Sequence, residues 1–308
     1  MQEKCLNQNE RQIILSLSGG LGNQLWQLAF AYSVMKRFSY TSTLLDETYY
    51  RKHPDYIRKP ELDAFLLSDQ IFKLDDSVQQ PFEYRLYCSL FSKYRGLNYV
   101  FNKQYTDNTF RFMYKKGYVI THNQVKYDIP SNINTLWLNG YFENYGQVKD
   151  IIPDFRKLLV LSKPSSEFHK YMDMISQSTW PVAVSVRCGE DFSKAKRMFC
   201  TSEYYNKALG FFPNQEIFLF SDEPAKAMEI TRLNDHVHVI PVLTPPEQLV
   251  LMFTCHDFIL ANSTFSYWGA LLSTYEDKKI IYPSQWLPWQ KTKDTGILYG
   301  SNNIIIEV

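Results

Sequence analysis

Short apolar runs alternate with longer amphipathic segments through the second half of the chain. The runs have the length and the β-branched content of buried strands, and the segments between them have the length of helices. This alternation predicts a parallel sheet whose strands are joined by helical crossovers. The expected strands are 182–186, 216–220, 236–240, 258–261 and 279–282, the last of which closes the series. The expected helices are 201–209, 224–233, 246–255 and 265–274.

The first half opens in the same way and then loses its period. An apolar run at 12–17 precedes a glycine-rich turn, a helical segment at 24–38 and a second apolar run at 42–46, which predicts a βαβ unit. Residues 51–127 mix aromatic and charged side chains without a clear period, so we assign no elements there. The run at 136–142 is expected to be the last strand of this half.

Two α/β domains are therefore expected, each with a Rossmann-like parallel sheet, since 308 residues suffice for two domains. The serines and the proline of 161–166 are typical of a linker. We accordingly place an N-terminal domain at 1–160 and a C-terminal domain at 161–308, with a cleft between them.

Composition argues against several classes of partner. A net charge of +1 provides no overall field to attract nucleic acid or an anionic membrane. The five cysteines are scattered and form no Cys-x-x-Cys pair, which indicates neither a disulfide framework nor a zinc site. The N-terminal segment lacks the apolar core of a signal peptide, and no apolar run reaches the roughly 18 residues of a membrane-spanning helix. We expect a cytoplasmic protein, with peripheral attachment to the inner membrane as an option.

A glycine turn follows the first expected strand. Gly19, Gly20 and Gly22 lie between that strand and the helical segment, where bare backbone can approach a ligand. A phosphate at the helix N-terminus is one interpretation. However, the glycine spacing matches neither the dinucleotide fingerprint nor the phosphate-binding loop that ends in Gly-Lys-Ser/Thr. A tight strand-to-helix turn is the alternative.

Polar residues follow the expected strands of the second half, at the edge where a doubly wound sheet binds its ligand. The Arg187 guanidinium can bind two phosphate oxygens at once, and the alternative is a surface salt bridge with Glu190 or Asp191. Asp222 can accept hydrogen bonds from a ribose or a purine, or it can cap the following helix. The run 262–264 places small donors at a helix start, which suits either an anion or a simple cap.

No metal and no cofactor are expected. The chain contains no Asp-x-Asp, the motif through which a divalent cation would bridge to phosphates. Its histidines are not spaced as metal ligands, and no Gly-x-Ser-x-Gly occurs. The glycine spacing also makes an oxidoreductase a poor alternative.

Several of these segments together resemble the signature motifs of the alpha-1,2-fucosyltransferases, glycosyltransferase family 11. The segment 18–30 is similar to their N-terminal glycine signature, and 138–144 to their Gly-Tyr-Phe-Gln segment. Residues 218–223 are similar to their Phe-Ser-Asp-Asp motif, and 259–270 to Asn-Ser-Ser-Phe-Ser-Trp-Trp-Gly-Ala. The matching segments follow one another in order between residues 16 and 286.

The resemblance implies a GT-B fold, in which two Rossmann-like domains face a cleft. The C-terminal domain would bind GDP-fucose, and the N-terminal domain would bind a galactose-containing glycan, such as a bacterial O-antigen unit that is free or lipid-linked. L-fucose would pass from GDP-beta-L-fucose to the 2-hydroxyl of a terminal galactose, with inversion and without a metal. The residues implied for the donor are Ser185, Arg187, Ser221, Asp222, Asn262, Ser263, Thr264 and Ser266. The residues expected to face the cleft on the acceptor side are Gly20, Gly22, Asn23 and Gln24.

One motif departs from the family pattern His-x-Arg-Arg-x-Asp. The corresponding run 185–190 keeps the first arginine, Arg187, and has Cys188 in place of the second. We hypothesise that Lys194, Lys196 or Arg197 supplies the missing positive charge at the phosphate. The alternatives are another GDP-deoxysugar donor such as GDP-L-colitose, and a non-catalytic relative that binds a sugar or a nucleotide.

The catalytic residues are expected near the same motif. Arg187 would stabilise the departing GDP, and Glu190 or Asp191 could remove the proton of the acceptor hydroxyl. Pairing of these carboxylates with a nearby Lys or Arg is the alternative interpretation.

Overall fold

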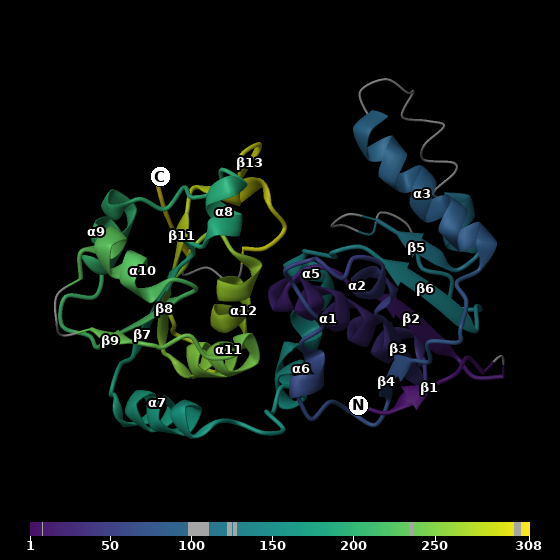
Figure 1. Ribbon diagram of the computed structural model, residues 1–308, viewed down its shortest axis with the longest axis horizontal. Helices are drawn as coiled ribbons and strands as arrows, with labels where there is room; N and C mark the ends of the chain where they lie inside the picture. The colour runs from purple at the N-terminus through teal and green to yellow at the C-terminus, as the bar shows by residue number, and fades with distance from the viewer. Residues whose placement is uncertain (8, 98–110, 122–124, 126–127, 234–236, 299–302) are drawn as a thin grey trace. The chain divides into compact units, whose positions relative to one another are not determined.

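The computed structural model describes residues 1–7, 9–97, 111–121, 125, 128–233, 237–298 and 303–308 (Figure 1). It divides into two compact units, which we treat separately. Unit 1 consists of Met1–Asp63 and Leu67–Leu158, and unit 2 consists of Ala64–Leu66 and Leu159–Val308. The short segment Ala64–Leu66 joins unit 2 because the Leu66 amide donates to the carbonyl of Val160 and Phe65 bridges to Leu161.

Unit 1 is built on a six-stranded parallel sheet with the order β1-β4-β3-β2-β6-β5. Its strands are β1 (Glu3–Lys4), β2 (Gln12–Ser16), β3 (Ser42–Asp46), β4 (Ile71–Leu74), β5 (Tyr118–Ile120) and β6 (Thr135–Asn139). From β2 the chain winds outward through β3 to β4, whereas β6 lies on the other side of β2. The strand order therefore reverses between β2 and β6, which makes this the topological switch point of the sheet.

The central helix of unit 1 is α1 (Leu21–Phe38), which packs on β2 and β3. Most of its residues are buried, which explains why its sequence is apolar on nearly every face. The other helices are α2 (Thr48–Lys52), α3 (Phe82–Leu97), α5 (Tyr145–Val148) and α6 (Ile152–Lys157), with short 3-10 turns at η1 (Leu62–Ala64) and η2 (Lys149–Ile151).

Unit 2 contains a second six-stranded parallel sheet with the order β14-β11-β10-β7-β8-β9. Its strands are β7 (Val182–Val186), β8 (Ile217–Ser221), β9 (His238–Val239), β10 (Asp257–Ile259), β11 (Ile280–Pro283) and β14 (Asn303–Ile306). Counted along the chain, this is the doubly wound order 3-2-1-4-5-6 read from its other edge, and the switch point lies between β7 and β10. A separate antiparallel pair joins β12 (Gln285–Leu287) to β13 (Gln290–Lys291), followed by the turn η3 (Thr292–Asp294).

Helices cover both faces of the unit 2 sheet. They are α7 (Ser166–Gln177), α8 (Glu190–Lys194), α9 (Ser202–Leu209), α10 (Pro224–Thr231), α11 (Pro245–Thr254) and α12 (Thr264–Leu272). In Figure 1, α9 and α10 lie on one side of the strands, and α11 and α12 lie on the other. The helices α11 and α12 pack so closely at Gly269 that a Cβ on this residue would collide with the Met252 sulfur.

The Glu247 side chain fixes where two of these helices begin. One of its carboxylate oxygens accepts from the Thr244 amide at 3.2 Å, which completes a capping box for α11, and from the Thr244 hydroxyl at 2.7 Å. The other accepts from the Ser165 amide at 2.8 Å, and the Ser165 hydroxyl caps α7. Although burial opposes it, these hydrogen bonds lower the pKa of Glu247 and keep it ionised. One carboxylate thus joins the starts of α7 and α11.

The expectation of an α/β protein with two parallel sheets is confirmed. The apolar runs of unit 2 form strands within a few residues of the expected bounds, but β9 is shorter, and residue 236 of that expectation lies outside the described residues. The expectation that the strand at 279–282 closes the series is wrong, because β14 pairs in parallel with β11. The unassigned region 51–127 holds the end of α2 together with η1, β4, α3 and β5.

Candidate functional site

Three strand ends of unit 2 meet at one edge of its sheet. Arg187 follows β7, Asp222 follows β8, and Asn262 lies just beyond β10. Because β7 pairs in parallel with both β8 and β10, the residues that follow these strands share the carboxyl edge at the switch point. The structure thus brings the predicted residues of three segments to one edge.

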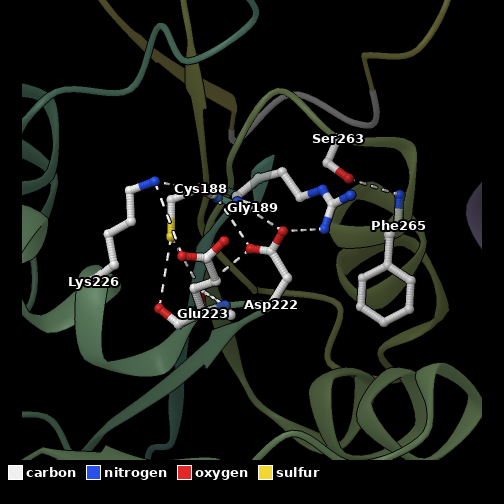
Figure 2. Close-up of polar contacts among 9 residues, drawn as sticks. Cys188, Gly189, Asp222, Glu223, Lys226, Ser263 and Phe265 are labelled. Carbon is white, nitrogen blue, oxygen red and sulfur yellow. Dashed lines mark hydrogen bonds and ion pairs between the residues drawn. The ribbon is translucent and has the colours of Figure 1, made fainter. Parts of the chain in front are cut away.

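Asp222 organises the loop that follows β7. Its carboxylate accepts from the amides of Cys188 at 3.0 Å and Gly189 at 2.9 Å, and it forms an ion pair with Arg187 (Figure 2). The Ser221 hydroxyl donates to the same carboxylate at 3.4 Å. A carboxylate has about four lone-pair positions, and these four donors use them. In this state Asp222 has no acceptor position left for a nucleoside.

Arg187 is held from two directions. Asp222 binds one end of its guanidinium, and the ring of Phe192 lies below it with the guanidinium carbon 5.6 Å from the ring centroid. The side chain is 19% exposed, so it remains accessible at the edge. A planar guanidinium fixed in this way is suited to bind two oxygens of a phosphate.

Lys226 brings a second positive charge to the same loop. Its ammonium donates to the Cys188 carbonyl at 2.7 Å and lies 4.0 Å from a Glu223 carboxylate oxygen, as Figure 2 shows. Sequence reasoning missed this residue. The available signal was its place in the first turn of α10, a helix that begins directly after the carboxyl end of β8.

Cys188 occupies the position of the second arginine in the family pattern His-x-Arg-Arg-x-Asp, and it carries no charge that could replace that arginine. Its side chain is buried, with the sulfur 3.5 Å from the Ser221 hydroxyl. Burial raises the pKa of the Cys188 thiol, so the thiol remains neutral. Cys188 itself therefore does not supply the positive charge that the family motif has at this position.

The polar residues around the start of α12 are engaged within the fold. Ser263 caps the helix by accepting from the Phe265 amide at 3.3 Å, and the buried Ser266 hydroxyl donates to the Ala261 carbonyl at 3.1 Å. The Asn262 amide donates to the carbonyls of Arg197 at 3.0 Å and Trp286 at 3.1 Å. Asn262 thereby ties the loop that carries Arg197 to the carboxyl edge of the sheet.

The two other predicted donor residues are also placed at this edge. Ser185 is buried in β7, where its carbonyl accepts from the Tyr205 hydroxyl at 2.9 Å. Thr264 is the first residue of α12.

The predicted bases lie in α8. Glu190 and Lys194 form an ion pair of 2.6 Å in which both side chains are largely exposed. The hydrogen bond from Lys194 lowers the pKa of Glu190. A low pKa weakens a carboxylate as a general base, so this geometry does not favour the assignment, which stays a prediction. The Asp191 side chain lies outside the described residues.

The three basic candidates for compensation differ in their surroundings. Lys194 forms the exposed ion pair with Glu190. Lys196 is exposed and has a positive φ of 53°. Arg197 is half-buried, and its backbone is held by Asn262. The arrangement favours Arg197 over the two lysines.

The glycine turn of unit 1 is closed by its own neighbours. Gly19 has a φ of +81°, and a Cβ there would stand 2.5 Å from the Asn23 amide nitrogen. A Cβ on Gly20 would lie 3.3 Å from the Arg58 side chain. The bare backbone therefore accommodates protein side chains, and Gly19 is also required by its backbone conformation.

A carboxylate occupies the start of α1. Glu61 accepts a hydrogen bond from the Leu21 amide at 2.9 Å. Burial raises the pKa of Glu61, although the Leu21 amide and the charge of Arg58 act in the opposite direction. Helix N-termini bind anions through such free amides, and here a side chain of the protein already does so.

Gln24 fastens the turn to the segment near Glu61. Its amide nitrogen donates to the carbonyls of Gly19 at 3.1 Å and Lys59 at 2.7 Å, and its oxygen accepts from the Glu61 amide at 2.9 Å. Tyr50 donates to the Gly19 carbonyl at 2.6 Å. Gln24 is fully buried, so its side chain holds the turn in place.

The other predicted cleft residues differ in exposure. Gly22 is buried within α1, whereas Gly20 and Asn23 are half-buried. The role of these residues toward an acceptor stays a prediction.

Within the described residues, no group of three or more His, Cys, Asp or Glu side chains is arranged to hold a metal ion. In the same part of the chain, none of the helices combines the length and the apolarity needed to cross a bilayer. None of the five cysteines, all of which lie within the described residues, forms a disulfide.

Comparison with known proteins places this geometry in context. The family model described as Glycosyl transferase family 11 matches residues 12–295. The O-antigen biosynthesis glycosyltransferase WbnK of Escherichia coli is 28% identical over 294 residues, which is 88% of this chain and 93% of that protein. An alpha-1,2-colitosyltransferase of Escherichia coli is 30% identical over 129 residues, covering 38% of this chain and 44% of that protein.

Solved structures show a similar fold. The fucosyltransferase NodZ from Bradyrhizobium superposes with a TM-score of 0.52 at 20% identity, over 92% of this chain and 98% of NodZ. NodZ co-crystallised with GDP superposes with a TM-score of 0.50 at 17% identity, over 85% of this chain and 92% of NodZ. The expected GT-B type of fold, with two Rossmann-like sheets, is thereby confirmed.

Proposed function

The chain belongs to glycosyltransferase family 11, and on that premise we propose that it transfers L-fucose from GDP-beta-L-fucose to the 2-hydroxyl of a terminal galactose. The acceptor is a glycan of the O-antigen type, free or lipid-linked, and the reaction takes place at the cytoplasmic side of the inner membrane. The relative named for O-antigen biosynthesis supports this acceptor class. The GDP complex of NodZ supports a GDP-activated donor.

The observation that carries the proposal is the gathering of cationic side chains at the switch point of the unit 2 sheet. Arg187 forms an ion pair with Asp222, and Lys226 donates to the Cys188 carbonyl in the loop after β7. Both cations thus lie at the edge where a doubly wound sheet binds its ligand. The acceptor hydroxyl displaces GDP from the anomeric carbon with inversion, and GDP departs with its diphosphate charge. Arg187 and Lys226 would stabilise that charge, so neither a metal nor a cofactor takes part.

Donor binding then rearranges the ion pair between Arg187 and Asp222. When Arg187 turns to the diphosphate, one lone-pair position of Asp222 becomes free for the guanosine. The two contacts predicted for these residues therefore form together.

GDP-L-colitose is the second candidate donor, and the partial match to the colitosyltransferase favours it. Colitose lacks one hydroxyl of fucose, so the site would need one polar contact fewer. A non-catalytic relative that binds a sugar or a nucleotide is the remaining alternative.

The deciding experiment incubates the purified protein with GDP-fucose or GDP-colitose and a panel of galactosides that includes lactose. We expect GDP release and a fucosylated product whose linkage NMR assigns to the galactose 2-hydroxyl. Faster turnover of GDP-colitose than of GDP-fucose would identify GDP-colitose as the donor. Binding of GDP without product or GDP release would favour the non-catalytic alternative.

A further inference from the structure

Three neighbouring strands of unit 1 end in polar residues at one level of the sheet. β2 ends at Ser16, β3 ends at Asp46 and β6 ends at Asn139. Ser16 is in register with both of the others, so the three side chains emerge on the same face. This edge includes the switch point between β2 and β6, which is the position where open α/β sheets bind ligands.

A chain of hydrogen bonds links these strand ends through α3. The Asn139 amide donates to the Tyr84 hydroxyl at 3.2 Å, the hydroxyls of Tyr84 and Ser16 are 2.7 Å apart, and Ser16 donates to Asp46 at 3.3 Å. Burial raises the pKa of Tyr84 well above its ordinary value, so its hydroxyl keeps its proton. The donors thus run in one direction, from Asn139 to the Asp46 carboxylate.

Asp46 is buried and has a full set of partners. One oxygen accepts from the Thr48 amide at 3.0 Å, and the other accepts from the Gln80 side-chain amide at 2.6 Å in addition to Ser16. A buried carboxylate is tolerated when donors surround it in this way. Asp46 therefore fixes the orientation of Gln80.

Gln80 and Asn139 are half-buried, unlike Asp46 and Tyr84, which are buried. Each amide donates its nitrogen into the cluster, and within the described residues neither amide oxygen accepts a hydrogen bond. Amide oxygens that are already oriented accept hydroxyl protons with little further loss of side-chain entropy. Two such oxygens at a sheet edge suit a ligand with several hydroxyls.

We propose that the strand-end cluster, defined as Ser16, Asp46, Gln80, Tyr84 and Asn139, is a sugar-binding subsite in which Gln80 and Asn139 accept hydroxyls of the acceptor's terminal sugar. The identity of that sugar as galactose rests on the proposed function. The cluster lies entirely within unit 1, and the donor edge lies in unit 2.

The test measures binding of methyl beta-D-galactoside by saturation-transfer NMR titration, without any donor. Gln80→Ala and Asn139→Ala are each expected to weaken binding about two- to tenfold, the effect of one neutral hydrogen bond. Ser42→Ala is the matched control, because Ser42 begins the same strand that Asp46 ends. Its buried hydroxyl has no hydrogen-bond partner among the described residues, and the variant should bind as the wild type does.

GDP affinity measured on every variant reports whether the fold is intact, and we expect it to be unchanged. If Gln80→Ala loses GDP binding as well, the similarly sized Gln80→Met decides, because it removes the polar group and keeps the volume. Equal galactoside affinity in the wild type and in both amide variants overturns the subsite, as does an absence of binding to the wild type. Galactoside binding that depends on Gln80 and Asn139, in a protein that transfers no fucose, would refute the proposed function and leave the subsite standing.

Discussion

Arg187 and Asp222 form an ion pair across the carboxyl ends of the neighbouring strands β7 and β8. The pair follows from register, because Val186 and Ser221 lie opposite each other and the next residue of each strand is one of the two. The anion that Arg187 meets in this state is therefore part of the protein. In the function that we propose, a donor diphosphate would have to compete with Asp222 for that guanidinium.

Replacing Arg187 by alanine is expected to weaken GDP binding at least about tenfold, because a hydrogen bond to a charged group is worth about 1.5–3 kcal/mol. Isothermal titration calorimetry measures the change directly. Lys194→Ala serves as the control, since Lys194 is occupied by an exposed pair with Glu190. A Kd for GDP within twofold of the wild type in Arg187→Ala would remove Arg187 from the donor site.

Lys226→Ala is expected to weaken GDP binding about threefold or more and to leave guanosine binding unchanged. The ammonium lies at the Cys188 carbonyl, and a partly exposed cation of this kind contributes through charge on the phosphates. The comparison of GDP with guanosine separates the phosphate contribution from that of the nucleoside. Equal losses for the two ligands would show that Lys226 acts on the base or on the loop.

Among the basic residues that follow the run 185–190, Arg197 is expected to contribute most to GDP binding. Arg197→Ala should weaken GDP about threefold or more, because Asn262 holds its backbone at the carboxyl edge. Lys196→Ala, a change at its exposed neighbour, should have no measurable effect. If neither variant alters the Kd for GDP, the hypothesis of compensation from this segment is wrong.

Glu190→Gln is expected to keep the transfer rate within about threefold of the wild type. Glu190 is exposed, and Lys194 holds its pKa below the usual value, whereas loss of a true general base costs about a hundredfold or more. Initial rates with GDP-fucose and lactose measure this. A hundredfold loss would assign the base to Glu190 after all, and Asp191→Asn tested in parallel covers the other predicted carboxylate.

Glu61→Gln is expected to flatten the pH dependence of stability. Burial raises the pKa of Glu61 in the folded state above its ordinary value of 4.5, so the native state binds more protons than the unfolded state in the range just above that value. The free energy of unfolding should therefore fall as pH rises through this range, and Glu61→Gln should lose that part of the fall. Urea unfolding at pH 5 and pH 7.5 on both proteins gives the difference.

Burial also raises the pKa of Glu47, but that residue is present in both proteins and cancels in the comparison. Identical changes of unfolding free energy between the two pH values, in the wild type and in Glu61→Gln, would contradict the assignment of this pH dependence to Glu61.

The strands β7, β8, β10 and β11 of unit 2 could be predicted because each is a short apolar run whose residues are all buried. The position of Arg187, Asp222 and Asn262 at one edge followed from the same runs, since the carboxyl ends of parallel strands share one edge. β4 was missed because only its first and last residues are buried, which produces no period. β14 was missed because its pattern is only partly buried.

The partners of the site residues could not be predicted from the chain alone. That Asp222 holds the amides of Cys188 and Gly189, 33 residues or more away along the chain, depends on the register of β7 against β8. The contact of Lys226 with the same loop depends in addition on where α10 begins. Local patterns indicate which residues reach an edge, but tertiary packing decides what each one binds.

Both units have a parallel sheet with a reversal of strand order, so topology alone does not indicate which unit binds a nucleotide. The two units differ at the start of α1, where the Glu61 carboxyl group lies. A phosphate that approached the glycine turn would meet the Glu61 carboxyl group, which already accepts from the Leu21 amide. If the donor binds in unit 2, as we propose, the Glu61 carboxyl group disfavours a second diphosphate at the start of α1, so the similar topology of unit 1 is not expected to provide a second GDP site.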